Sequence, residues 1–217
     1  MRLVFVLTLA LITAFMKKPE PKPLYFLALG DSYTVGEAVA EEERWPVQLA
    51  QLLRQKGYNV QPPEIIATTG WRTDQLKEAI EKGTKRTVYD MVSLLIGVNN
   101  QYQGKSVESY RPEFEELLLK AIELAGKNKD RVFVVSIPDY GYTPFGREKQ
   151  PLISAAIDAY NAANREIAEK HGVRYFYITD LTRKGLDDPS LVAPDGLHPS
   201  GKMYALWAEH IAAGLKQ

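Results

Sequence analysis

Five apolar runs along the chain predict β-strands. The first, residues 24–29, is apolar at every position and changes to polar residues within one position at its end. A continuous apolar run of this length is typical of a strand buried on both faces of a parallel sheet. Val60 and residues 64–67 predict a second strand, and later runs predict strands at residues 88–96, 131–137 and 173–178.

The stretches between these runs carry apolar residues at helical spacing. They predict helices that begin at Pro46, Asp74 (with Thr73 as its cap), Pro112 and Pro151, and a last helix that begins at Pro199-Ser200. Strand and helix thus alternate along the whole chain, which indicates a parallel sheet with helices on both faces. The expected fold is a three-layer α/β/α sandwich with a flavodoxin-like parallel sheet of about five strands.

Composition narrows the classes of function. The chain has 217 residues, of which 45% are hydrophobic, enough for one domain with a substantial core. Its 27 basic residues balance its 27 acidic residues, so no net field attracts nucleic acid or anionic lipid. The absence of cysteine excludes disulfides, thiol catalysis and thiolate metal sites. No metal-binding spacing appears, no cofactor is implied, and nothing predicts an oligomeric state.

The N-terminus differs from the rest of the chain. Arg2 precedes an apolar run at residues 3–16, which is short for a membrane span but suits the core of a signal peptide. Residues 17–23 are rich in proline and lysine and predict a linker, so the folded domain is expected at 24–217. We therefore expect an exported protein, periplasmic or secreted. The alternative is an uncleaved anchor that holds the protein at a membrane through residues 3–16.

Candidate chemistry begins where the first strand ends. Asp31 and Ser32 follow Gly30, at the edge of the sheet where open α/β folds bind their ligands. Both residue types are favoured helix N-caps, so the pair could serve only to begin a helix. Whether Asp31 and Ser32 have a catalytic role depends on which other polar residues lie at the same edge of the sheet.

A second polar motif precedes the last predicted helix. Asp195 and His198 are three residues apart with a glycine between them, close enough for the carboxylate to reach the imidazole. A carboxylate on one ring nitrogen leaves the other free to act as a base toward Ser32. Ser32, Asp195 and His198 are therefore candidates for a catalytic triad.

These motifs resemble the four conserved blocks of the SGNH/GDSL hydrolases, in the same order along the chain. The matching residues are Gly30-Asp31-Ser32-Tyr33, Gly70, Gly97-Val98-Asn99 and Asp195-Gly196-Leu197-His198-Pro199. The resemblance implies that Ser32 is the nucleophile, that His198 is the base and that Asp195 orients His198. It also implies an oxyanion hole made by the backbone N–H groups of Ser32 and Gly70 and the side-chain amide of Asn99. Two positions depart from the family pattern: Tyr33 replaces leucine, and Asn100 stands where an aspartate usually follows Asn99.

The leading hypothesis is a serine esterase that hydrolyses small acyl esters or lysophospholipid-type lipids through an acyl-enzyme on Ser32. The same site could instead remove O-acetyl groups from carbohydrates of the cell envelope. A third hypothesis is a flavodoxin-like binding module that holds a phosphate after the first strand, but Asp31 would repel that phosphate. Residues that could line an acyl groove or stack on a sugar, or could equally lie in the core, are Trp71, Tyr102, Tyr140, Tyr142 and Phe145.

Overall fold

Five parallel strands form a single sheet in the computed structural model, which describes residues 21–215. The strand order is β2-β1-β3-β4-β5, as in flavodoxin-like folds. This confirms the predicted α/β/α fold, although each strand is shorter than the apolar run that predicted it. The strands are β1 (Phe26–Gly30), β2 (Glu64–Ala67), β3 (Met91–Leu95), β4 (Val132–Val135) and β5 (Arg174–Phe176).

The register of the sheet brings the candidate residues to one edge. Gly30, the last residue of β1, pairs with Ala67 of β2 on one side and with Leu95 of β3 on the other. Because all five strands run in the same direction, the segments that follow these residues leave the sheet together. Ser32, Gly70 and Asn99 lie on those segments.

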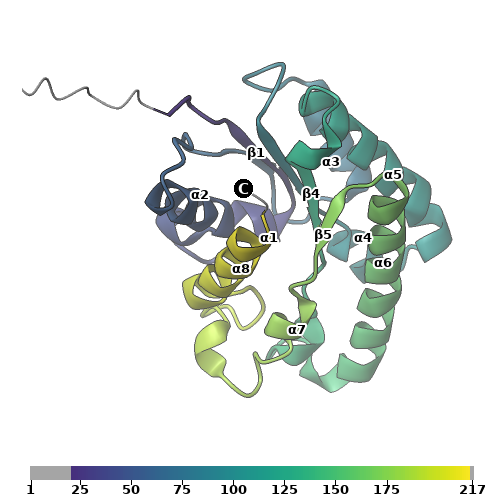
Figure 1. The fold of residues 1–217 in the computed structure, drawn as a ribbon. Helices are drawn as coiled ribbons and strands as arrows, with labels where there is room; N and C mark the ends of the chain where they lie inside the picture. Colours follow the sequence, from purple (N-terminus) through teal and green to yellow (C-terminus); the bar gives the residue numbers. More distant parts are fainter. Residues whose placement is uncertain (1–20, 216–217) are drawn as a thin grey trace, which may run out of the picture.

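Helices cover the two faces of the sheet (Figure 1). On one side, α2 (Trp45–Gln55) packs against α8 (Gly201–Gly214). On the other side, α3 (Thr73–Glu81), α5 (Val107–Leu124) and α6 (Gln150–Lys170) lie next to one another. The last helix buries Tyr204, Trp207 and Ile211. Three short helices, α1 (Ser32–Val35), α4 (Val98–Tyr102) and α7 (Thr179–Thr182), were not predicted.

The predicted start of α5 is wrong, and the other predicted helix starts differ from the structure by one or two residues. Helix α5 begins at Val107, because the Ser106 hydroxyl oxygen accepts the N–H of Ser109 and caps the helix there. Pro112 lies inside the helix, where its missing N–H removes one backbone hydrogen bond without ending it. Helix α3 has Arg72 as its N-cap, and Thr73 is its first residue.

The predicted signal peptide or anchor at residues 1–16 lies outside the described residues, as does the first part of the linker. The described chain starts just before Leu24, which forms an isolated parallel bridge with Val60. No helix within residues 21–215 is both long enough and apolar enough to span a lipid bilayer.

Candidate active site

Ser32 is the first residue of α1, directly after the end of β1. Asp31 is the N-cap of this helix, and its Oδ1 accepts the N–H of Tyr33 at 3.1 Å. A Cβ on Gly30 would overlap the Thr34 side chain and the Leu95 carbonyl, so only glycine lets α1 pack this closely on the strand ends. Asp31 is therefore a helix N-cap, as one interpretation of the sequence suggested. Ser32 lies at the edge of the sheet with 5% of its surface exposed.

Asp195 and His198 form one compact turn. The Asp195 Oδ1 atom accepts the backbone N–H groups of Leu197 and His198 at 2.9 and 3.0 Å. Its Oδ2 atom lies 2.6 Å from His198 Nδ1. Because an ionised carboxylate only accepts hydrogen bonds, Nδ1 carries the proton and Nε2 is the free acceptor of the neutral ring.

The charge of Asp195 is stabilised by these contacts. Partial burial raises the pKa of the Asp195 carboxyl, but hydrogen bonds from the His198 ring and from the two backbone N–H groups outweigh it. The pKa of Asp195 therefore lies below its ordinary value. The Asp195 carboxylate therefore stays ionised at neutral pH and accepts the hydrogen bond from the His198 ring.

A cavity of about 210 Å³ brings the predicted residues together and is called here the Ser32 cavity. His198 lines this cavity, whereas Asp195 contacts His198 Nδ1 and does not line the cavity. In the described part of the chain no hydrogen bond joins Ser32 to His198, and such bonds are often long in sites without substrate. The lining residues are Ser32, Tyr33, Thr69, Gly70, Val98, Asn99, Tyr102, Tyr140, Phe145, Leu197 and His198.

Asn99 and Gly70 are the candidates for the oxyanion hole besides the Ser32 N–H. Asn99 lies in α4, and Gly70 lies in the loop between β2 and α3. Asn99 donates one side-chain N–H to the carbonyl oxygen of Trp71 at 2.9 Å. An amide group has two such donors, so the second remains for a ligand in the cavity. Gly70 is exposed and has a φ of +85°, a left-handed conformation that favours glycine.

Asn100 has a structural role that the sequence did not indicate. Its side chain is fully buried, accepts the N–H of Thr73 at 3.2 Å and donates to the Thr73 hydroxyl at 2.7 Å. That hydroxyl in turn donates to Glu113. Asn100 thereby joins α4 to the first residue of α3 and to α5. An aspartate here would lack the N–H that Thr73 accepts.

Three of the five predicted aromatic residues line the Ser32 cavity. Tyr102, Tyr140 and Phe145 form a cluster with ring centroids 6.2–6.4 Å apart. Trp71 lies outside the lining and packs against the core. Tyr142 also lies outside it, with the guanidinium of Arg183 6.0 Å from its ring.

The sequence analysis gave four lining residues no role in the site, although three of them lie within the matching blocks and Thr69 directly precedes Gly70. The most informative is Tyr33, whose buried ring meets the His198 ring edge-on at a centroid distance of 5.7 Å. The same ring lies 6.4 Å from that of Trp207 on α8. Their position within or next to the matching blocks was the sequence signal that could have identified them. The four residues are Tyr33, Thr69, Val98 and Leu197.

Asp31 is fully buried, and its Oδ2 atom has no hydrogen-bond partner among the described residues. Burial raises the pKa of Asp31 from its ordinary 3.8 to about 7, despite the hydrogen bond from Tyr33. As pH rises above 3.8 the unfolded state ionises more readily than the folded state, so this group lowers stability progressively until about pH 7.

We therefore expect Asp31→Asn to raise the melting temperature at pH 8 by several degrees and to change it little near pH 4. The amide keeps the oxygen that accepts the Tyr33 N–H but carries no charge to bury. Thermal unfolding at both pH values measures the effect, with Asp130→Asn at an exposed position as the control. An equal change at both pH values would contradict this account.

Comparison with solved structures supports the fold. A catalytic mutant of an acetylxylan esterase from Geobacillus stearothermophilus has a TM-score of 0.70 at 16% identity, with 89% of this chain and 94% of that chain covered. A lipolytic protein of the G-D-S-L family from Veillonella parvula has a TM-score of 0.68 at 17% identity, with 88% and 97% covered. A psychrotrophic esterase from a Pseudoalteromonas species has 0.63 at 16% identity, with 88% and 96% covered.

No curated protein was found to match the sequence. The model of the GDSL-like lipase/acylhydrolase family matches residues 28–206. This match includes Ser32, Gly70, Asn99, Asp195 and His198, and it extends over most of the described domain. The chain therefore belongs to the GDSL-like lipase/acylhydrolase family of ester-hydrolysing enzymes.

Proposed function

We propose that this enzyme hydrolyses carboxylic esters through an acyl-enzyme formed on Ser32. The observation that carries the proposal is the 2.6 Å contact between Asp195 Oδ2 and His198 Nδ1. The His198 ring lines the same cavity as Ser32. Gly70 and Asn99 line the same cavity and supply donors for a developing oxyanion.

In this mechanism, His198 Nε2 takes the proton of the Ser32 hydroxyl while Oγ forms a bond to the ester carbonyl carbon. Negative charge moves to the carbonyl oxygen, where the N–H groups of Ser32 and Gly70 and the amide of Asn99 stabilise it. Asp195 stabilises the imidazolium. The C–O bond to the alcohol then breaks and the alcohol leaves with the proton from His198. Water repeats the two steps to release the acid.

Asn99→Ala tests the oxyanion assignment. We expect kcat to fall by about 100- to 1,000-fold with a smaller change in KM, because the lost donor acts mainly on the transition state. Steady-state kinetics and a thermal melt measure the two effects. Asn128→Ala, at an exposed position in another loop, is the control. A loss confined to KM would instead make Asn99 a substrate-binding residue.

The walls of the cavity favour an apolar acyl group. Tyr102 and Phe145 are 60% and 54% exposed, although both are large and apolar. Together with Tyr140 they also line an adjoining cavity that reaches Leu152, which is 76% exposed. Leu152 and Ile153 give this adjoining cavity an apolar part, although Gln101, Glu148 and Lys149 line it as well. The apolar residues suit the chain of a lipid ester of the lysophospholipid type.

The second candidate function is removal of O-acetyl groups from carbohydrates. The exposed rings of Tyr102 and Phe145 are the observation that favours it, because aromatic faces of this kind can also stack on a sugar ring. One of the structural neighbours is an acetylxylan esterase.

A panel of substrates separates the two functions. We expect hydrolysis of p-nitrophenyl esters with a preference for acyl chains longer than acetate, and labelling of Ser32 by a fluorophosphonate. Faster turnover of acetylated oligosaccharides than of any longer-chain ester would favour the carbohydrate function. Labelling of a different serine would contradict the mechanism itself.

A further inference from the structure

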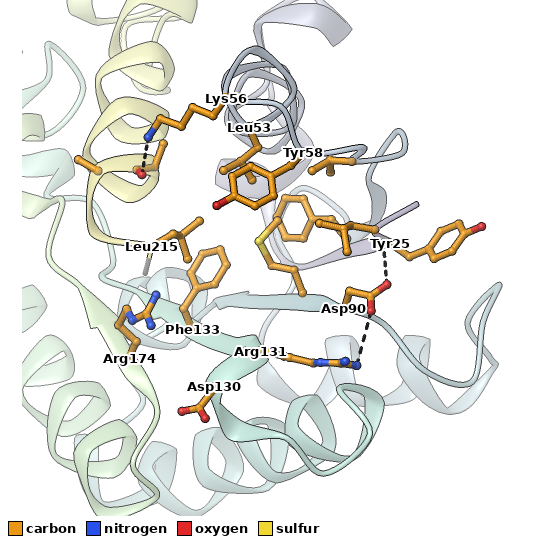
Figure 2. A pocket seen from close by; sticks show the side chains of 16 residues that line it. Tyr25, Leu53, Lys56, Tyr58, Asp90, Asp130, Arg131, Phe133, Arg174 and Leu215 are labelled. Carbon is orange, nitrogen blue, oxygen red and sulfur yellow. Dashed lines mark hydrogen bonds and ion pairs between the residues drawn. The ribbon is translucent and has the colours of Figure 1, made fainter. Parts of the chain in front are cut away.

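A second cavity lies at the opposite edge of the sheet, where the strands begin (Figure 2). It is lined by the first residues of three strands: Phe26 of β1, Met91 of β3 and Arg174 of β5. The ends of α2 and α8 close its other side. Its lining shares no residue with the Ser32 cavity. We call it the basal cavity.

The basal cavity has the size and character of a small-molecule site. Its volume is about 260 Å³, just below the range of roughly 300–1,000 Å³ that is common for pockets of drug-sized ligands. Buried Leu53 and Phe133 and half-buried Leu215 form much of its wall. Apolar walls of this kind suit a ligand with a short hydrocarbon chain.

Most of the charged groups around the basal cavity already have partners or point elsewhere. Asp90 lies 3.6 Å from the guanidinium of Arg131. The ammonium of Lys56 donates to the carbonyl oxygen of Ala212 at 2.8 Å. Asp130 is exposed, and Figure 2 shows it pointing away from the cavity.

Besides Asp130, three polar side chains of the lining form no hydrogen bond or ion pair with another residue of the described chain: Tyr25, Tyr58 and Arg174. The Tyr25 hydroxyl points away from the cavity in Figure 2. The Tyr58 hydroxyl and the Arg174 guanidinium lie on either side of Leu215. A few polar groups in an apolar pocket are typical of a ligand site.

We propose that the basal cavity binds a small fatty acid. Its carboxylate pairs with Arg174, whose planar N–H groups match two carboxylate oxygens, and accepts a hydrogen bond from Tyr58. Its chain packs on Leu53 and Phe133. Fatty acids are also products of the proposed ester hydrolysis, but this binding does not depend on that activity.

Calorimetric titration of the full chain with octanoate, octanol and octylamine tests the proposal. Octanoate is expected to bind, and Arg174→Gln should weaken its binding about tenfold or more while leaving octanol binding unchanged. Ala213→Trp, an enlargement at the exposed lining of the cavity, should abolish octanoate binding. Ala162→Trp makes the same change at an exposed position of α6 and should have no effect.

Three outcomes would overturn the proposal. One is the absence of octanoate binding. Another is octanoate binding that survives both Arg174→Gln and Ala213→Trp, which would place the ligand in the Ser32 cavity. The third is equal weakening of octanoate and octanol by Arg174→Gln, because the head group would then play no part. Hydrolysis of a p-nitrophenyl ester, measured on the same variants, is expected to be unchanged, so failure of this proposal is distinct from failure of the esterase function.

Discussion

Ser32→Ala is expected to lower kcat for ester hydrolysis by about 10⁴- to 10⁶-fold while the melting temperature stays unchanged. The loss is large because no acyl-enzyme can form without Oγ. The fold is expected to survive, because the Ser32 side chain makes no hydrogen bond to another part of the described chain and α1 is capped by Asp31. Pre-steady-state kinetics with a p-nitrophenyl ester, together with a thermal melt, measures both quantities.

The matched control is Ser109→Ala, at an exposed position on α5. It should keep full activity. If Ser32→Ala retained a large part of the wild-type rate at an unchanged melting temperature, the nucleophile would be another group. A variant that lost stability together with activity would show a structural role for Ser32, and labelling by a fluorophosphonate would then identify the nucleophile in the wild type.

Asp195→Asn is expected to lower kcat by about 10⁴-fold. The amide oxygen can still accept the two backbone N–H groups that Asp195 Oδ1 accepts, so the turn is kept. The amide nitrogen then faces His198 Nδ1, which must become an acceptor. The ring proton moves to Nε2, and this tautomer cannot take a proton from Ser32.

The control for this variant is Asp188→Asn in the same loop, where the carboxylate binds Lys202 at 2.8 Å. It should leave kcat nearly unchanged. Near-normal turnover by Asp195→Asn would show that His198 works without this carboxylate. A drop in kcat with unfolding of the loop, seen as faster amide exchange around His198, would instead make Asp195 a residue of the turn alone.

The sequence predicted the parts of the molecule that depend on short-range pattern. The apolar runs predicted the inner strands β1, β3 and β4, because a strand buried on both faces has few polar positions. The edge strands β2 and β5 are only partly buried, but their shorter apolar runs also predicted them. The contact of Asp195 with His198 was predictable because the two residues are three apart and share one turn. The start of α5 was wrong because Pro112 was given more weight than the cap at Ser106.

Contacts between distant segments were not predictable in this way. The hydrogen bonds from Asn99 to Trp71 and from Asn100 to Thr73 join α4 to the start of α3 and the residues just before it. Their geometry depends on how the sheet register aligns those segments, and residue type alone does not encode it. The same limit applies to the contact between His171 at the end of α6 and Glu115 of α5, whose side-chain atoms lie 2.6 Å apart.

The turn at Asp195 has a consequence for how the catalytic geometry is maintained. Asp195 and His198 are fixed to each other within four residues, so the proposed triad consists of two preassembled pieces, this turn and the Ser32 segment. Only their mutual alignment depends on the rest of the fold. Tyr33 belongs to the Ser32 segment, and its ring packs against both His198 and Trp207 of the helix that follows the turn. One aromatic side chain therefore joins the segment of the proposed nucleophile to the proposed base, at the position where the family pattern has leucine.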